Sequence, residues 1–175
     1  ARFGTSINKC AYGCIGIDFQ YSRGIDVASR SQSETGNGTP LSRSSAKAQF
    51  SHFSLNTSYR FSPLENYEVK LNSGGQLSFD DLLNSEQSSI TGLNKLSGFT
   101  SGSISGDESW YFRGQVNRNY YLSKDIKISP YLYGAAGVAY TLTPTEIENR
   151  ATAAKSVGLG LEVSGNDKYF FDKRI

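Results

Sequence analysis

The sequence predicts an all-β fold, an antiparallel transmembrane β-barrel to which this chain contributes about seven strands. Three observations predict it: the composition, the length of the segments with alternating polarity, and the order of long and short connections. Eleven Tyr, ten Phe and eighteen Gly among 175 residues, with four Pro, are typical of strands joined by many turns. No apolar run approaches the roughly 20 residues of a membrane helix, which excludes a helical membrane protein.

Six segments alternate apolar and polar residues with a period of two, as strands with two different faces do. The first places Ile15, Ile17, Phe19 and Tyr21 on one face. The other five cover residues 53–61, 67–79, 110–120, 126–140 and 157–163, and a seventh begins within 168–175. At about 9 to 13 residues, such strands exceed the usual five or six of soluble domains and approach the length that a tilted strand needs to cross a bilayer.

The connections between these segments alternate in length along the whole chain. They are long at about 26–48, 80–108 and 142–154, and short at 62–66, 122–125 and 165–168. An outer-membrane barrel has long external loops and short periplasmic turns, so this order predicts such a barrel. Cys10 and Cys14 would then flank a periplasmic turn, and their spacing leaves open whether they form a disulfide or remain two free thiols.

Charge and isolated polar residues argue against several other functions. The formal net charge of +2 is scattered along the chain, so no nucleic-acid partner is expected. His52 stands alone on a polar face and is expected to be a solvated or hydrogen-bonded residue rather than a catalytic or metal-binding one. Asp80, Asp81 and Glu86 lack the ligand spacing of a calcium loop and indicate a solvated loop. We therefore expect no enzyme activity, no cofactor and no metal site.

The alternation alone does not show which face of the sheet points outwards. A membrane barrel turns its apolar face to lipid and leaves the polar face in a wet lumen. The polar face includes Asp18, Lys70, Gln76, Arg113 and Glu162. A soluble ligand-binding β-barrel turns its apolar face inwards instead, and this alternative stays open at the level of sequence.

Several stretches, taken in order, resemble the C-terminal barrel region of a known family. They are "KAQFSHFSLNTSYRFSPLENYEVKLNSGGQLSFDDLLNSEQSSITGLNKLSGF", "ISGDESWYFRGQV", "SPYLYGAAGVAY" and "SVGLGLEVSG". The family is that of two-partner secretion transporters, the TpsB or haemolysin-activator type, in the superfamily of outer-membrane barrel-assembly proteins. The resemblance implies a pore in the outer membrane of Gram-negative bacteria that exports an unfolded exoprotein of the haemolysin or filamentous-adhesin type. A barrel-assembly insertase is the alternative within the superfamily, and the implied partners are the secreted exoprotein and outer-membrane lipid.

The resemblance also implies how much of the family's architecture this chain covers. In the family, a 16-stranded barrel follows two periplasmic domains that capture the substrate. Residues 1–175 would form a partial C-terminal barrel domain, running from near the eighth strand into the fifteenth. The periplasmic domains and the closing strand would be absent from it.

The long loop at about 80–108 resembles the family's sixth external loop, which folds back into the lumen. The residues that match the flanks of that loop are Gln76, Ser85, Glu86, Gly106, Asp107 and Arg113. A Val-Arg-Gly-Phe or Val-Arg-Gly-Tyr signature marks the loop tip in the family. The corresponding residues here are Gly92, Leu96, Ser97, Gly98 and Phe99, so Ser97 replaces the signature arginine.

In the family, the partner of the signature arginine is an aspartate on a lumen-facing strand, two residues before a glycine. The corresponding positions here are Ala135 and Gly137, so both members of this latch are missing. The resemblance therefore implies a loop that is held by Phe99 packing and backbone hydrogen bonds, or held loosely. It also implies that Ser97 and Ala135 lie close enough for a restored Arg–Asp pair to interact.

Overall fold

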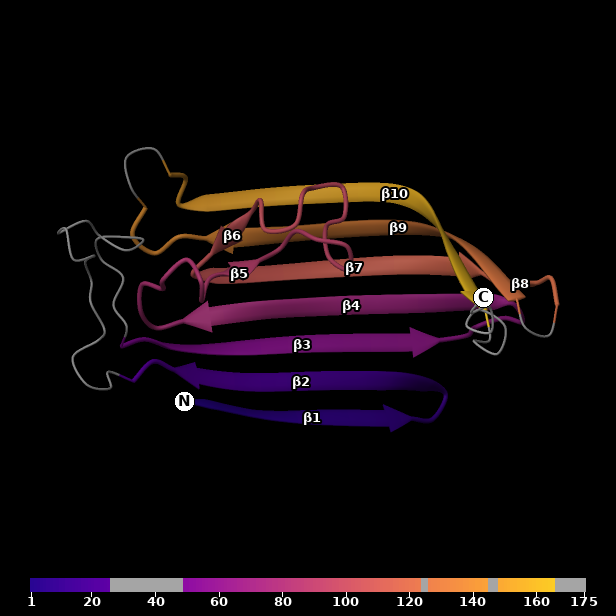
Figure 1. Cartoon of the computed structure of the whole chain (residues 1–175), viewed down its shortest axis with the longest axis horizontal. Coiled ribbons are helices and arrows are strands. Elements are labelled where there is room, and N and C mark those ends of the chain that lie inside the picture. Colours follow the sequence, from indigo (N-terminus) through magenta and orange to yellow (C-terminus); the bar gives the residue numbers. More distant parts are fainter. Residues whose placement is uncertain (26–48, 124–125, 145–147, 166–175) are drawn as a thin grey trace, which may run out of the picture.

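The computed structural model describes residues 1–25, 49–123, 126–144 and 148–165, and the regular elements in these ranges are β-strands (Figure 1). The long strands are β1 (Arg2–Cys10), β2 (Gly13–Arg23), β3 (Ser51–Phe61), β4 (Tyr67–Ser78), β7 (Glu108–Arg118), β9 (Ile126–Tyr140) and β10 (Ala151–Gly165). The short strands are β5 (Ser88–Ser89), β6 (Ser105–Gly106) and β8 (Tyr120–Tyr121). No helix in the described residues is long and apolar enough to cross a membrane.

The long strands form one antiparallel sheet in the order β1-β2-β3-β4-β7-β9-β10, and β8 pairs with one end of β9. Each long strand therefore lies beside the long strand that precedes it in the chain. The short strands β5 and β6 form a separate ladder within the β4–β7 connection. This topology confirms the predicted all-β antiparallel class.

The sequence pattern does not predict β1, because only Phe3 and Ile7 give this strand large apolar side chains. Strand β1 nevertheless pairs with β2 along its whole length, from Arg2 opposite Ser22 to Cys10 opposite Cys14. Its position thus follows from hydrogen bonding to a neighbouring strand rather than from its own apolar content. The further segment that we predict within 168–175 lies outside the described residues.

Long and short connections lie at opposite ends of the sheet (Figure 1). The strand ends that border the β1–β2, β3–β4 and β7–β9 turns lie at one end of the sheet, and those that border the β2–β3, β4–β7 and β9–β10 connections lie at the other. This is the arrangement that the alternating connection lengths predict for an outer-membrane barrel. Residues 26–48 of the first long connection and the predicted turn at 166–168 fall outside the described ranges.

The two faces of the sheet differ in polarity and in exposure. Large apolar side chains remain exposed on one face, with exposed fractions of 63% for Leu77, 76% for Val157 and 82% for Leu159. The connection between β4 and β7 lies on the polar face. Gln76 and Arg113 are both buried on that face rather than exposed to solvent. The apolar face therefore points outwards, as in a membrane barrel, and the alternative of a soluble barrel with inward apolar side chains is wrong.

An ion pair shows that the polar face is concave. Lys70 on β4 lies with its Nζ 2.7 Å from Oε2 of Glu162 on β10. Strands β7 and β9 lie between these two strands, so a flat sheet would separate β4 from β10 by about 14 Å. The direct contact requires the sheet to curve around its polar face, as the wall of a barrel does.

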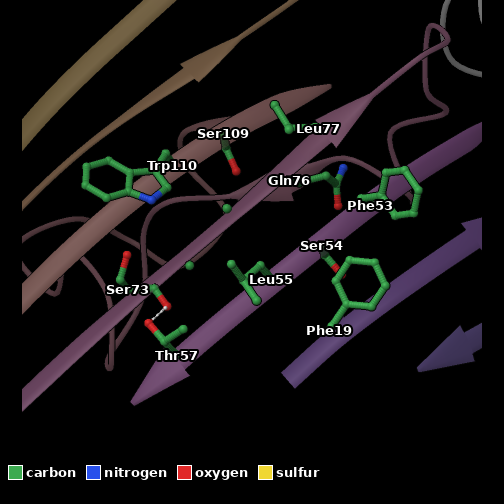
Figure 2. A pocket seen from close by; sticks show the side chains of 12 residues that line it. Phe19, Phe53, Ser54, Leu55, Thr57, Ser73, Gln76, Leu77, Ser109 and Trp110 are labelled. Carbon is green, nitrogen blue, oxygen red and sulfur yellow. Dashed lines mark hydrogen bonds between the residues drawn. The ribbon is translucent and has the colours of Figure 1, made fainter. Parts of the chain in front are cut away.

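A shallow groove crosses the outer face where β4 lacks a side chain at Gly75 (Figure 2). A Cβ atom at Gly75 would lie 2.8 Å from Cδ1 of Trp110, so the indole ring covers this position. The large apolar residues that line the groove are Phe19, Phe53, Leu55, Leu77 and Trp110. Because no charged side chain lines it, the groove belongs to the apolar outer surface rather than to a site for chemistry.

Candidate functional site

The connection between β4 and β7, residues 79–107, is the candidate site, and we call it the β4–β7 loop. It folds back over the polar face of the sheet instead of extending away from the sheet's end (Figure 1). Ile90 donates its backbone N–H to Ile104 O over 3.0 Å, next to the β5–β6 ladder, so the two arms of the loop are joined to each other. The loop is therefore an ordered element with two points of attachment to the wall, its base and its tip.

A buried carboxylate organises the base of the loop. Asp107 is fully buried, and its Oδ1 accepts hydrogen bonds from Leu82 N and from Gln87 Nε2, each over 3.1 Å. Its Oδ2 accepts a hydrogen bond from Leu142 N over 2.9 Å. One side chain thus joins the start of the loop, the first arm of the loop and the beginning of the β9–β10 connection. Charge-assisted hydrogen bonds of this kind are the strong ones in a buried setting.

The loop-flanking residues that the sequence identifies converge at this base, except for Ser85 and Arg113. Gln76 donates from Nε2 to Glu86 O over 3.0 Å and to Asp107 O over 3.2 Å. Gly106 lies so close to β9 that a Cβ atom there would be 2.5 Å from Tyr140 O, so only glycine fits. Ser85 is exposed on the surface of the loop, and Arg113 contacts the tip of the loop instead.

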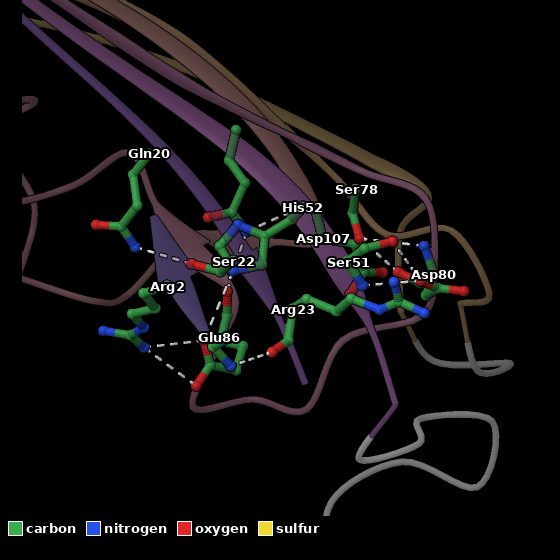
Figure 3. A network of polar contacts seen from close by, with 12 residues as sticks. Arg2, Gln20, Ser22, Arg23, Ser51, His52, Ser78, Asp80, Glu86 and Asp107 are labelled. Atoms are coloured by element: carbon green, nitrogen blue, oxygen red, sulfur yellow. Dashed lines mark hydrogen bonds and ion pairs between the residues drawn. The ribbon is translucent and has the colours of Figure 1, made fainter. Parts of the chain in front are cut away.

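A second polar cluster lies beside the base and connects the loop to β1 and β3 (Figure 3). Glu86 Oε2 lies 3.2 Å from the Arg2 guanidinium and 3.6 Å from His52 Nε2. His52 is buried, and Asp80 accepts hydrogen bonds from both the backbone and the hydroxyl of Ser51. Glu86 is therefore paired with residues of two neighbouring strands, whereas Asp80 is exposed, as expected for a solvated loop. His52 is covered by this cluster rather than solvated.

The tip of the loop is anchored by two apolar side chains. Ile90 and Leu96 are fully buried and belong to one cluster with residues of β7 and β9. The wall residues of that cluster are Tyr111, Tyr133, Ala135 and Ala139. Phe99, which the family resemblance suggested as the anchor, is 40% exposed, so Leu96 fills that place instead. The apolar anchor of the tip thus lies three residues earlier in the chain.

The backbone of the tip forms a tight turn around Leu96. Gly92 has a φ of 139°, a conformation that residues with a side chain rarely adopt. Lys95 N donates to Gly92 O over 3.0 Å, and Leu96 N donates to Ile90 O over 3.2 Å. The Lys95 ammonium donates to Ser89 O, and burial lowers the pKa of Lys95. These contacts lie within the loop itself and define the shape of its tip.

Arg113 on β7 binds the tip from the wall. Its guanidinium donates to Ser97 Oγ over 2.8 Å and to Lys95 O over 3.1 Å, both from the same nitrogen. The other terminal nitrogen donates to Gln115 Oε1 over 2.9 Å, and the guanidinium carbon lies 3.9 Å from the centre of the Tyr133 ring. The sequence places Arg113 on the polar face and among the loop-flanking residues, but it does not identify the contact with the loop tip. Its alternation with Gln115 was the signal that it faces the loop.

The two positions of the missing latch lie on either side of this arginine. Ala135 is the register partner of Arg113 and is buried in the cluster that holds Leu96. Ser97 accepts the hydrogen bond of Arg113. Gly137 lets the loop approach β9, because a Cβ atom there would lie 3.3 Å from Cβ of Ile90. Gly98 brings the tip to β10, where a Cβ atom would lie 3.1 Å from Cβ of Ser156.

Beyond the tip, the polar face carries a charged network. Glu162 accepts hydrogen bonds from Lys70, from Gln115 Nε2 over 2.8 Å and from Asn117 Nδ2 over 3.1 Å. Gln115 also accepts from Arg113, so this network is continuous with the contact at the loop tip. Among the described residues, no group of three His, Cys, Asp or Glu side chains could hold a metal ion. The arrangement is that of a polar wall with a docked loop.

The turn between β1 and β2 is closed by a disulfide between Cys10 and Cys14. The two cysteines are also register partners at the ends of these strands. The structure thus decides between the disulfide and the two free thiols that the sequence left open. A disulfide is typical of a protein that folds in an oxidising compartment, such as the periplasm.

Comparison with known protein families identifies the chain. The family described as haemolysin secretion/activation protein ShlB/FhaC/HecB matches residues 2–163. The chain belongs to this family. Its members are outer-membrane proteins of Gram-negative bacteria that act in two-partner secretion.

A solved structure with the same fold is that of CdiB from Escherichia coli, with a TM-score of 0.73 and 18% sequence identity. The match covers 94% of this chain and 30% of CdiB, so the chain spans less than a third of that protein. The comparison with curated protein sequences finds no match. The likeness to CdiB supports a barrel wall for the sheet.

Proposed function

We propose that this chain is part of an outer-membrane pore that exports an unfolded exoprotein by two-partner secretion. The family supports the transport class, and the outward apolar face supports a position in the bilayer. The observation that carries the proposal is the β4–β7 loop, which lies across the polar face where a polypeptide would pass. A loop that covers the wall of the lumen has to move or deform before a chain can be threaded past it.

In this proposal the residues at the base of the loop and those at its tip have different roles. Asp107, with Gln76, fixes the base so that the loop stays attached to the wall during transport. Leu96 and its neighbours hold the tip against β7 and β9. The exported protein is of the haemolysin or filamentous-adhesin type, and it passes the charged network around Glu162 as an extended chain. The periplasmic domains and the remaining strands belong to the rest of the transporter.

The test uses the full gene that encodes this chain, expressed together with the exoprotein encoded beside it. Secretion of that exoprotein into the medium should require the transporter gene. The export function is supported if cells that lack the gene no longer secrete the exoprotein but keep normal levels of other outer-membrane proteins. A general loss of those proteins, with no specific loss of the exoprotein, would support a barrel-assembly insertase instead.

The orientation of the barrel is tested separately by labelling whole cells. Asn149→Cys, in the β9–β10 connection, should react with a thiol reagent that does not cross the membrane, whereas Glu65→Cys, in the β3–β4 turn, should not. Cys10 and Cys14 form a disulfide, so the unsubstituted protein serves as the unlabelled control. Equal labelling at both positions would contradict the orientation.

A further inference from the structure

We propose that Arg113 is a latch that holds the tip of the β4–β7 loop from the barrel wall, in place of an arginine on the loop itself. The contact involves a guanidinium on β7 and two acceptors on the loop, Ser97 Oγ and Lys95 O. Compared with the arrangement that the family resemblance implies, the cation has moved from the loop to the wall. Its role in export rests on the proposed function, whereas the contact itself does not.

The geometry of the contact is specific for the loop tip. Lys95 and Ser97 flank Leu96, so one guanidinium nitrogen binds the residues on both sides of the buried apolar anchor. Loss of Arg113 would therefore release both hydrogen bonds at once and expose Leu96 to water. Gln115 binds the other terminal nitrogen and fixes the direction in which the guanidinium points. A planar group with several donors suits this task better than the single ammonium of a lysine.

The position of Arg113 explains why neither residue of the expected latch is needed. Ala135 lies opposite Arg113 in the sheet register, so an aspartate there would stand beside a cation that is already engaged with the loop. In the ranges that the structure describes, no carboxylate forms an ion pair with Arg113. Its buried charge is stabilised instead by three neutral oxygens and by the face of the Tyr133 ring.

Neutral acceptors make this latch easier to open than an ion pair. A hydrogen bond from arginine to a carbonyl or hydroxyl is weaker than the bidentate contact of arginine with a carboxylate. The exported chain also carries hydroxyl and carbonyl groups, which can replace those of Ser97 and Lys95 without leaving Arg113 unpaired. The latch is thus suited to release when the lumen is occupied and to close again afterwards.

Trypsin provides a direct readout, because Lys95 is the only lysine or arginine in residues 79–107. Its carbonyl, part of the bond that trypsin cleaves, accepts the hydrogen bond of Arg113. In the purified full-length transporter, Arg113→Lys should accelerate cleavage after Lys95 by about 5- to 30-fold, the change that one or two kcal/mol gives. Arg118→Lys is the matched control, since Arg118 is exposed on the same strand, and it should leave the rate unchanged.

A second variant strengthens the latch and does not depend on removing a buried group. Ser97→Asp places a carboxylate at the acceptor position and should slow cleavage after Lys95 by about fivefold or more through a charge-assisted pair. In the Arg113→Gln background the same substitution should accelerate cleavage, because the carboxylate then lacks its partner. Cleavage that is unaffected by Arg113→Lys, or a Ser97→Asp effect that is the same in both backgrounds, would overturn the latch.

Export of the exoprotein is measured in parallel and separates the latch from the proposed function. Ser97→Asp should reduce export by holding the tip closed, and Arg113→Gln should relieve that reduction. If cleavage responds as expected while export by every variant stays at the parent level, the latch stands and its role in secretion is wrong.

Discussion

The β4–β7 loop is fixed to the wall in two places, and the two differ in the sign of the charge that holds them. At the base, the buried anion of Asp107 accepts hydrogen bonds from three separate segments. At the tip, the cation of Arg113 donates to two neutral groups on either side of Leu96. The comparison indicates that the base of the loop stays attached to the wall, since loss of the Asp107 carboxylate would break contacts to several elements. The tip, in contrast, can detach from the wall.

Removal of the carboxylate at the base should have the largest effect. Asp107→Ala leaves the buried N–H group of Leu82 without an acceptor and also removes the hydrogen bonds from Gln87 and Leu142, at a cost of about 2 to 3 kcal/mol. We expect a clear fall in the melting temperature of the purified full-length protein and rapid proteolysis of the whole loop. Glu108→Gln, at the next residue, is the control and should cost far less. Similar melting temperatures for the two variants would show that Asp107 does not hold the base of the loop.

Truncation of the apolar anchor should affect the tip alone. Leu96→Ala removes a fully buried side chain and should cost about 2 to 4 kcal/mol of local stability. Cleavage after Lys95 should accelerate strongly, while the melting temperature falls less than it does for Asp107→Ala. Leu93→Ala is the matched control, because Leu93 is 83% exposed in the same loop. A Leu96→Ala variant that cleaves no faster than this control would show that Leu96 does not anchor the tip.

Restoration of the family's Arg–Asp pair should reveal coupling through Arg113. Ser97→Arg places a second cation beside Arg113 and should loosen the tip, whereas Ala135→Asp supplies a carboxylate opposite that arginine. Because Ser97 and Ala135 both lie beside Arg113, the double variant should differ from the sum of the single ones by about 0.5 to 3 kcal/mol. Proteolysis by proteinase K measures the effect, since Ser97→Arg adds a trypsin site. Additive effects of the two substitutions would mean that the positions do not interact.

The smallest effect should come from the pair between the loop and β1. Glu86→Gln removes an ion pair with Arg2, whose side chain is 66% exposed, so we expect a loss of at most about 0.5 kcal/mol. Because salt screens exposed charges, the difference from the parent protein should vanish at high ionic strength. Glu65→Gln, in an exposed turn, is the control. A loss that persists in high salt would place Glu86 with the buried base instead.

Much of the fold could be predicted because alternation of polarity is a local property of a strand. The segments at 53–61, 67–79 and 126–140 match β3, β4 and β9 to within two residues at each end. The segment at 157–163 covers only the second half of β10, since the small residues at the start of this strand carry little apolar signal. Strand β1 was missed for the same reason.

The sequence by itself determined most of the long strands, the alternation of long and short connections, and the glycine and polar positions of the loop. The tertiary structure decided which face points outwards, that Leu96 rather than Phe99 is buried, and that Asp107 and Arg113 are the charges that hold the loop. The physical reason is distance along the chain. The periodicity of a strand depends on neighbouring residues. Ser97, which binds Arg113, and Leu142, which binds Asp107, lie 16 and 35 residues away, and these contacts form only when the chain folds back onto the sheet.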